Sequence, residues 1–304
     1  MKTKTAAQFR RSPFFYVGDK FKLVPQLKEY FPTDINRFIE PFCGGGSVFL
    51  NVEAESYLIN DIESYMIALH QLLINYSNDV SEFWNDLNGI IEQYQLSASF
   101  LGTTVPEEYK VNFVKTYYAK YNKDSYMKLR ADFNEDKSDL LKLYVLLIYG
   151  FNRMLRFNNS GNFNLPVGNV DFNQNVVNAL HSYFEYVASK EITLYNHDFE
   201  DFLSEVKPVS TDFIYLDPPY LISFSEYNKL WNTDTENRLL TLLDELDKKN
   251  IRFAISNIIR HKNMYNGIFD EWSKKYHVHD ITSNYISFND NTQKGSYEVL
   301  VTNY

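Results

Sequence analysis

The sequence has a single cysteine, Cys43, among its 304 residues. One thiol allows no intramolecular disulfide and no zinc site built on several cysteines, which excludes the zinc deaminases with their paired cysteines. The six histidines include no helical pair with a glutamate. His277 and His279 flank Val278 in a strand-like alternation, so we expect them to share one face of a sheet, and we predict no metal site.

Long apolar runs are lacking too. No run approaches the roughly 18 apolar residues that a membrane-spanning helix needs. Residues 1–5 lead into Arg10 and Arg11 without the apolar core of a secretory signal. We therefore expect a cytoplasmic protein that binds no membrane. The apolar fraction of 44% is enough to bury a large core, in one domain or in two.

The chain also lacks net positive charge. It has 30 Lys and Arg residues and 39 Asp and Glu residues, so its formal net charge is −9. That sum argues against a nucleic-acid partner, but the distribution matters more. Residues 1–28 carry seven Lys or Arg against one acid, and residues 140–170 carry three and no acid. Two basic segments on an acidic body suit a protein that contacts a polyanion with one face. The alternative is that these side chains are merely solvated.

The stretch Asp217-Pro218-Pro219-Tyr220 follows the apolar run 213–216, which predicts a buried strand. The prolines end this strand because neither can donate to a sheet ladder. The four residues are therefore expected in a loop at a strand's carboxyl end, where ligands bind in open α/β sheets. The alternative is a simple turn with a surface aromatic.

A second strand, Arg37-Phe38-Ile39, leads into a glycine-rich loop, and residues 47–52 are expected to begin a helix. A strand, a glycine turn and a helix bring backbone close to a nucleotide-like ligand. A dinucleotide fingerprint needs a third glycine three residues after Gly46, where the sequence has Phe49. This weakens the hypothesis of an NAD-dependent oxidoreductase. The acid before the loop, Glu40, is instead typical of S-adenosylmethionine sites.

A third strand, 57–61, ends at Asp61, whose carboxylate can accept hydrogen bonds from both ribose hydroxyls of either cofactor. The structural alternative for Asp61 is a helix N-cap.

Helical patterns dominate from about Ser64 to Tyr149, with a loop at 97–106 and a buried helix expected at 140–149. Two strand-like runs then flank the turn-forming residues 158–161, and this pattern predicts a β-hairpin. Arginine, asparagine and phenylalanine interleaved on such a hairpin can contact base edges and wedge between bases. The alternative is an Asn-rich surface turn.

Strands and helices alternate again in the last third of the chain. We expect strands at 192–195, 213–216 and 251–256, a helix at 235–249, and two final strands, 272–281 and 297–302, that pair as a hairpin. The pattern predicts one α/β sheet interrupted by a helical insertion. The expected domains are a catalytic domain of residues 1–65 and 181–304 and an inserted domain of residues 66–180.

In this order the motifs resemble the Dam-like adenine-N6 DNA methyltransferases of the D12 class. The resemblance spans nearly the whole chain and rests on Tyr16 to Lys20, Glu40 to Gly46, Asp61, Arg130 with Phe133-Asn134, the hairpin Asn152 to Pro166, and Asp217 to Tyr220. It implies a Rossmann-like sheet with helices on both faces and an inserted, mainly helical target-recognition domain that carries a β-hairpin. It implies a site-specific enzyme that flips adenine out of double-stranded DNA and methylates N6.

The resemblance also implies roles for single residues. The catalytic residues are Asp217, Pro218, Pro219 and Tyr220. The residues implied to bind S-adenosylmethionine are Tyr16, Lys20, Glu40, Pro41, Phe42, Cys43, Gly44, Gly45, Gly46, Asp61, Asp198, Phe199 and Asp217. Those implied to bind DNA are Phe15, Arg130, Asn134, Phe151, Asn152, Arg153, Arg156, Asn158 and Asn164.

Two positions depart from the family pattern. Asp19 replaces a glycine, and Phe15 stands where Dam itself has a lysine that reads a base. Because phenylalanine cannot make a charged base contact, we do not expect the recognition sequence to be GATC.

The chemistry also follows from the residues themselves. An exocyclic adenine amine is a poor nucleophile because its lone pair is delocalised into the ring, so a site must offer acceptors to both of its hydrogens. The Asp217 carboxylate and the Pro218 carbonyl can be these acceptors. Tyr220 offers a face for the flipped base, a contact worth roughly 1–3 kcal/mol. Cys43 is expected to be a small packing residue.

Other functions stay open at this point. One is a catalytically silent DNA-binding protein with the same fold, although the presence of Asp217 and Glu40 disfavours it. Another is a methyltransferase that acts on cytosine N4 or on RNA. The resemblance also allows the modification half of a restriction-modification system, whose cognate restriction endonuclease would not contact this chain directly.

Overall fold

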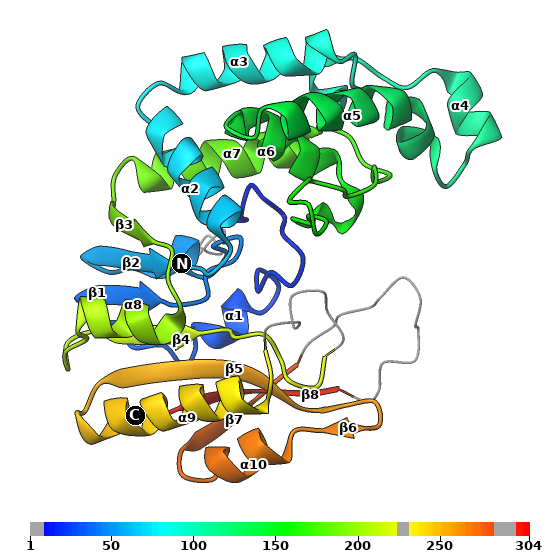
Figure 1. Ribbon diagram of the computed structural model, residues 1–304. Helices are drawn as coiled ribbons and strands as arrows, with labels where there is room; N and C mark the ends of the chain where they lie inside the picture. Colours follow the sequence, from blue (N-terminus) through cyan, green and yellow to red (C-terminus); the bar gives the residue numbers. More distant parts are fainter. Residues whose placement is uncertain (1–8, 224–230, 283–295) are drawn as a thin grey trace, which may run out of the picture. The chain divides into compact units, whose positions relative to one another are not determined.

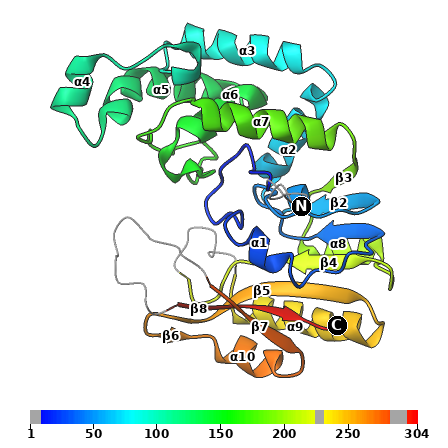
Figure 2. The ribbon, with the colours of Figure 1, turned by 180° about the vertical axis from the view of Figure 1, so that it is seen from behind.

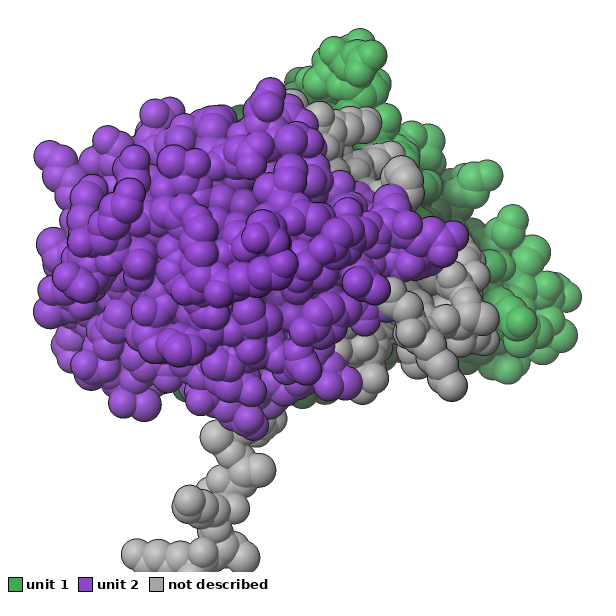
Figure 3. Space-filling model, turned by 90° about the horizontal axis from the view of Figure 1, so that it is seen from below, with its two compact units in different colours: residues 1–19, 44–50, 63–189 green, residues 20–43, 51–62, 190–304 purple. Residues whose placement is uncertain are grey.

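The computed structural model describes residues 9–223, 231–282 and 296–304, and the chain divides into two compact units (Figure 3). The helical unit comprises residues 1–19, 44–50 and 63–189, and the sheet unit comprises residues 20–43, 51–62 and 190–304. The expected insertion, residues 66–180, lies within the third stretch of the helical unit. The first 19 residues and the three glycines at 44–46 belong to the same unit as these helices.

The described part of the helical unit holds the helices α2 (Ser64–Tyr76), α3 (Val80–Gln93), α4 (Glu107–Asn112), α5 (Tyr117–Glu135), α6 (Leu140–Tyr149) and α7 (Gln174–Val187) (Figure 1). The α6 helix is buried nearly all round, which confirms the prediction from its apolar sequence. Side chains of Asp79, Asp139 and Asn173 accept backbone N–H bonds at the starts of α3, α6 and α7. Such caps explain where these helices begin.

The sheet unit contains a mostly parallel sheet with the strand order β3-β2-β1-β4-β5-β8-β7, and a short β6 pairs with β5. Its strands are β1 (Arg37–Glu40), β2 (Ser56–Asn60), β3 (Glu191–Tyr195), β4 (Phe213–Leu216), β5 (Arg252–His261), β6 (Met264–Tyr265), β7 (His277–Ile281) and β8 (Ser296–Thr302). The first five strands of this order run parallel, and β8 is antiparallel to β5 and β7. The predicted α/β class and Rossmann-like sheet are thereby confirmed.

Helices α8 (Phe199–Val206), α9 (Thr233–Lys248) and α10 (Gly267–Ser273) pack on one face of this sheet (Figures 1 and 2). Their apolar side chains form a continuous core with Ile39 of β1, Ile214 of β4 and Ile255 of β5. On the other face, Phe31 follows the short helix α1 (Val24–Leu27) and packs edge-on against Phe213, with ring centroids 4.9 Å apart. The alternation of faces along the strands thus sets which side each helix covers.

Two expected elements differ from the structure. Residues 47–52 form only the 3-10 helix Phe49–Asn51, because strand β2 begins at Ser56 and leaves no room for a longer helix. Trp272 lies in α10 and not in a strand. Asn266 caps that helix by accepting from the Phe269 N–H, and Trp272 stacks on Phe253 of β5. The final hairpin itself is confirmed, since β7 and β8 pair antiparallel.

The expected β-hairpin at 150–166 is present only as a partly paired loop. Isolated antiparallel bridges join Gly150 to Val167 and Phe157 to Phe163. Its first arm begins with the 3-10 turn Phe151–Arg153, where Asn152 has φ +54° and cannot continue an extended strand. A continuous two-stranded ladder was therefore the wrong expectation, although the tight turn was right.

No helix of the described ranges combines the length and the apolarity needed to cross a membrane.

Candidate active site and nucleic-acid interface

The predicted catalytic loop lies at the point where the strand order reverses. Strand β1 pairs in parallel with β2 on one side and with β4 on the other. From β1, the strands β2 and β3 follow towards one edge of the sheet, and β4 and β5 follow towards the other edge. The loops that follow β1 and β4 therefore leave the sheet at neighbouring positions, where open α/β sheets bind ligands. Asp217 directly follows β4, as the sequence predicted.

Asp217 is held by two of the predicted site residues. Its Oδ2 forms an ion pair with Lys20 Nζ at 2.8 Å, and its Oδ1 accepts a hydrogen bond from the Tyr220 hydroxyl at 3.0 Å. The Lys20 Nζ also lies 5.0 Å from the centroid of the Tyr220 ring. The Lys20 side chain is only 7% exposed and that of Asp217 18%, so water screens this pair little. The geometry fixes the carboxylate with one cation and one hydroxyl.

Glu298 of β8 joins this group, although it was not among the residues predicted from the sequence. Its Oε1 lies 3.2 Å from the Tyr220 hydroxyl, and the residue is 2% exposed. The hydroxyl has one proton for two carboxylates, so it cannot donate fully to both. A signal was available, since Glu298 is the one charged residue inside the run Tyr297–Thr302. Buried acids in strands need partners and therefore mark candidate sites.

Asn60 connects three loops at this edge of the sheet, and it too was missed. Its Nδ2 donates to the Pro41 carbonyl at 2.9 Å and to the His197 carbonyl at 3.0 Å, while its Oδ1 accepts from the His197 N–H. The Asn60 carbonyl in turn accepts from the Cys43 N–H at 2.9 Å. Asn60 is 1% exposed. One buried amide thus fixes the segments that carry Phe42 and Asp198 beside the end of β2.

Three aromatic rings gather above these loops. The Phe42 ring lies 5.6 Å from Phe199 and 5.7 Å from Trp231, and Phe199 lies 6.0 Å from Trp231, as centroid distances. Phe42 and Phe199 were predicted cofactor residues, whereas Trp231 was not. Flat apolar rings beside an acid, Asp198, suit a purine ring with a polar edge.

Trp231 is anchored by a buried carboxylate. Its indole Nε1 donates to Glu236 Oε2 at 2.6 Å, and Glu236 Oε1 accepts from the side chains of Asn257 and Asn266 at 3.2 and 3.1 Å. Burial raises the pKa of Glu236, and the three hydrogen bonds oppose that rise. The network holds the start of α9, β5 and the start of α10 together.

Asp198 has an observed structural role, and its role in cofactor binding stays a prediction. It caps α8 by accepting from the Glu200 N–H, and it also pairs with Arg238 at 3.0 Å. The Arg238 guanidinium lies 5.2 Å above the Phe199 ring and also pairs with Glu200. These ion pairs are largely exposed, so their contribution to stability is small.

Asp61 follows β2, and the N-cap of the next helix is Glu63, which accepts from the Tyr65 N–H. The N-cap alternative for Asp61 is therefore wrong, and its role as a ribose acceptor stays a prediction.

Cys43 is 6% exposed. Burial, together with the charges of Asp61 and Glu40, raises its pKa well above the usual value of a thiol. A thiol kept neutral in this way is a weak nucleophile, and the burial of Cys43 is what a small packing residue shows.

The glycines of the predicted loop have steric reasons for being glycine. Gly46 has φ +77°, and a Cβ there would lie 2.3 Å from Phe49 and 2.9 Å from His70. At Gly45, a Cβ would lie 3.0 Å from the Cβ of Tyr16, a predicted cofactor residue. His70 Nε2 lies 2.9 Å from the Gly44 carbonyl, and its Nδ1 lies 3.1 Å from the Tyr183 hydroxyl. The buried His70 was missed, and it braces this half of the loop.

Several predicted DNA-binding residues hold the hairpin together. Arg130 donates to the Leu165 carbonyl at 3.0 Å, and the Asn134 amide pairs with the Phe163 backbone through both its oxygen and its nitrogen. Both residues come from α5, so they fasten the returning arm of the hairpin to that helix. Their contact with DNA stays a prediction, beside this observed role.

The turn itself is shaped by Asn158, whose Oδ1 accepts from the N–H groups of Ser160 and Asn162. Across the hairpin, Arg156 donates from Nε to Asn164 Oδ1 at 2.9 Å and from Nη2 to the Asn164 carbonyl at 2.7 Å. This leaves three of the five guanidinium N–H groups without a partner among the described residues.

Phe151 and Asn152 are exposed at the base of the hairpin, and Phe151 is 52% exposed. A large exposed aromatic next to a strained backbone suits a residue that enters a base stack.

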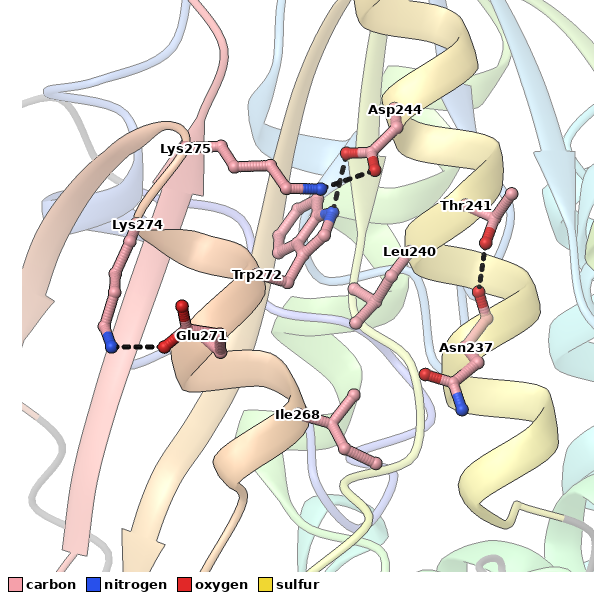
Figure 4. Close-up of a pocket in the computed structure, with 9 residues that line it drawn as sticks. All are labelled: Asn237, Leu240, Thr241, Asp244, Ile268, Glu271, Trp272, Lys274 and Lys275. Atoms are coloured by element: carbon pink, nitrogen blue, oxygen red, sulfur yellow. Dashed lines mark hydrogen bonds and ion pairs between the residues drawn. The ribbon is translucent and has the colours of Figure 1, made fainter.

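The sheet unit also contains a pocket of about 580 Å³ between α9 and α10 (Figure 4). Its lining includes Asp244, Trp272 and Lys275, and Asp244 accepts hydrogen bonds from both others. None of the predicted site residues lines it. The candidate active site is therefore identified by the ion pair and the hydrogen bond that hold Asp217, and not by the volume of a pocket.

The described residues contain no group of three or more His, Cys, Asp or Glu side chains placed to hold a metal ion.

Comparison with known proteins shows the family of the chain. Residues 16–286 match the family model described as D12 class N6 adenine-specific DNA methyltransferase. The chain is similar to the Type II methyltransferase M.FokI of Planomicrobium okeanokoites, at 34% identity over 97% of this chain and 43% of that protein. It is also similar to the modification methylase StsI of Streptococcus sanguinis, at 31% identity over 100% of this chain and 44% of that protein.

The chain thus spans less than half the length of M.FokI and StsI. The DNA adenine methylase of Escherichia coli is 24% identical, and there the match covers 94% of this chain and 92% of that protein.

Proposed function

The chain belongs to the D12 class N6 adenine-specific DNA methyltransferases, and we propose that it methylates adenine N6 at a specific sequence of double-stranded DNA with S-adenosylmethionine as methyl donor. One observation carries the proposal. Asp217 stands at the reversal point of the sheet with its carboxylate fixed by Lys20 and Tyr220, next to two prolines whose backbone offers acceptors and no donor. An amine nucleophile needs such an acceptor.

In the proposed reaction the target adenine leaves the duplex and places its N6 amine near Asp217. The Asp217 carboxylate and the Pro218 carbonyl accept hydrogen bonds from the two amine hydrogens, which returns lone-pair density to the nitrogen. That pair forms the new N–C bond while the bond from the methyl carbon to sulfur breaks and its electrons stay on sulfur. The amine then gives one proton to Asp217, so no covalent enzyme intermediate forms.

Residues of the sheet unit fit the methyl donor. Phe42, Phe199 and Trp231 offer flat faces for its adenine, Asp198 precedes Phe199, and Asp61 directly follows β2, the strand next to β1. When bound, S-adenosylmethionine supplies an electrophilic methyl carbon on a positively charged sulfur. We propose that these residues, with Lys20, Glu40, Pro41 and Cys43, bind it in the sheet unit. For Tyr16 and for Gly44, Gly45 and Gly46, cofactor binding stays a prediction from the sequence.

We further propose that residues 66–180 recognise the target sequence, whereas residues 1–65 and 181–304 bind the methyl donor and perform the transfer. Residues 150–166 supply the base contacts, with Phe151 as the stacking residue. The names of M.FokI and StsI as a type II methyltransferase and a modification methylase support a role as the modification half of a restriction-modification system. Its partner nuclease would share the DNA site without contacting this chain, and a DNA substrate favours a cytoplasmic location.

The test is incubation with S-adenosylmethionine labelled in the methyl group and a random-sequence duplex, followed by nucleoside analysis. We expect label in N6-methyladenine, at sites that share one sequence. Label in N4-methylcytosine, preferential labelling of RNA, or DNA binding without transfer would each replace the proposal with one of the other functions.

A further inference from the structure

Two arginines from distant parts of the helical unit stack on one phenylalanine. The guanidinium carbon of Arg11 lies 4.6 Å from the centroid of the Phe15 ring, and that of Arg153 lies 4.5 Å from the same centroid. Cations attract the electron-rich face of an aromatic ring, but two cations on one ring also repel each other. Phe15 therefore gathers two like charges that the sequence separates by more than a hundred residues.

The environment of Arg153 opposes its charge. Burial lowers the pKa of Arg153, and the charge of Arg11 lowers it further, whereas Tyr144, Asp171 and Asp19 act in the opposite direction. Among the described residues no carboxylate forms an ion pair with Arg153, whose Nε lies 3.4 Å from the Ile148 carbonyl. A mostly buried guanidinium is stabilised by an anion, and for Arg153 none of the described carboxylates supplies one in an ion pair.

The backbone is strained at both ends of the contact. Phe15 has φ +48° and Arg153 has φ +50°, in the left-handed region that is unfavourable for residues other than glycine. Such conformations persist where the surroundings enforce them, and they cluster at ligand-binding sites. The strain thus falls on the two residues that bring the ring and the buried cation together.

We propose that Arg11, Phe15 and Arg153 form a clamp for one phosphodiester group of the DNA backbone. The inference rests on the proposed function, because it takes DNA as the ligand. A phosphodiester has two non-bridging oxygens and one negative charge, so it can bond both guanidinium groups and reduce their repulsion. A base edge is neutral and accepts hydrogen bonds from a single guanidinium group, so it does not reduce the repulsion between the two arginines. The clamp therefore positions the duplex without reading its sequence.

Arg10 provides a matched control. Its guanidinium carbon lies 4.8 Å from the Tyr186 ring centroid, so it is also an arginine on an aromatic ring in the same segment. No second arginine shares that ring among the described contacts. Loss of Arg10 removes the same charge from the chain as loss of Arg11, without opening the clamp.

The experiment measures binding of a fluorescent random-sequence duplex of about 20 base pairs by anisotropy at a series of salt concentrations. One lost phosphate contact lowers the slope of log affinity against log salt by about one unit. Arg11→Ala and Arg153→Ala should each show this change, and so should the double variant, because both residues bind the same phosphate. Arg11→Lys should keep most of the slope, and Arg10→Ala should keep all of it.

Several outcomes would overturn the clamp. An unchanged slope in Arg11→Ala with a lower melting temperature means that the arginines only fasten the chain. An equal loss in Arg10→Ala means a general effect of charge. A loss confined to duplexes with one sequence means base readout. The labelled methyl-transfer assay, run on the wild type, separates this result from the proposed function: a clamp-dependent slope without transfer keeps the clamp and rejects the enzyme.

Discussion

At the scale of single residues, the sharpest test concerns Asp217. We expect Asp217→Ala to lower the rate of methyl transfer by at least about a hundredfold, because removal of one preorganised electrostatic partner typically costs about 3 kcal/mol of transition-state stabilisation. Single-turnover kinetics with a duplex that carries the mapped site measures this. Affinity for S-adenosylmethionine, measured by calorimetry, should fall less.

Asp217→Asn is the matched control, since it keeps an acceptor oxygen but not the charge that pairs with Lys20. A rate within tenfold of the wild type in Asp217→Ala contradicts the role of Asp217 as the amine's acceptor.

The second prediction concerns the hydroxyl of Tyr220. From the sequence, this residue was expected to act only through its flat face. The structure adds hydrogen-bond contacts to Asp217 at 3.0 Å and to Glu298 at 3.2 Å. A hydrogen bond to a charged group contributes about 1.5–3 kcal/mol, so Tyr220→Phe should slow transfer by about tenfold or more. Tyr220→Ala should slow it further, because the face is lost as well.

Glu298→Gln tests whether Glu298 positions Tyr220. If Glu298 acts through that hydroxyl, its effect on transfer should largely disappear in a Tyr220→Phe background, as a double-mutant cycle shows. Full additivity of the two losses, accompanied by equal losses of thermal stability, points to a merely structural glutamate.

At the scale of elements, Asn60 links the loops after β1, β2 and β3. We expect Asn60→Ala to lower the free energy of unfolding by about 1–3 kcal/mol, since buried groups of the Pro41 and His197 backbone lose their partner. Affinity for S-adenosylmethionine should fall as well, because the loops with Phe42 and Phe199 are released.

Urea unfolding and calorimetry measure the two effects of Asn60→Ala. Asn237→Ala, on the exposed side of α9, is the control. Normal affinity in a destabilised Asn60→Ala variant contradicts the link between this amide and the cofactor loops.

The hairpin gives the fourth prediction. Arg156 keeps three N–H groups beyond those that bond Asn164. If they contact a guanine edge, Arg156→Ala should weaken cognate binding by about 1–3 kcal/mol and relax the preference at one base position. Profiling on a randomised duplex library measures this.

Asn164→Ala removes the same brace across the hairpin and leaves the arginine in place. Equal profiles for Asn164→Ala and Arg156→Ala assign Arg156 to bracing, and an unchanged profile in Arg156→Ala removes it from the proposed base contacts.

The elements themselves were predictable where local chemistry decides them. The run 213–216 followed by two prolines specifies both the strand β4 and its end. The apolar run of α6 specifies a buried helix. By contrast, the segment that includes Trp272 has strand-like residues, and its helix α10 depends on the cap at Asn266 and on packing against Phe253. Tertiary contacts overrode local propensity there.

At the scale of the whole molecule, the order of motifs predicted the fold class and placed Asp217 directly after a strand, but it did not predict the partners of each side chain. Asp217 and Lys20 were both expected at the site, yet their ion pair joins residues that the sequence separates by almost two hundred positions. Glu298, Asn60 and Trp231 were missed for the same reason. The local sequence around each of them shows nothing unusual, and their roles depend on contacts with loops that are distant in the sequence.

The last prediction concerns stability and pH, through the buried His70. Burial lowers its pKa to about 4, against an ordinary value near 6.5, although the hydrogen bond with the Gly44 carbonyl opposes the shift. The unfolded chain therefore binds a proton at pH values where the folded chain does not. Stability from neutral His70 is fully present above pH 6.5 and is lost progressively as the pH falls from 6.5 towards 4.

Between pH 7 and pH 5 this one group should lower the free energy of unfolding by about 2 kcal/mol, at 1.36 kcal/mol per pKa unit. His70→Gln keeps a polar side chain but does not titrate, so its stability should fall less than that of the wild type over this interval, by the same amount. Urea unfolding of both proteins at the two pH values gives the change in the free energy of unfolding for each. Subtracting one change from the other removes the contribution of the carboxylates, which both proteins share. Parallel pH profiles would show that His70 is already protonated, or exposed to water, in the folded protein.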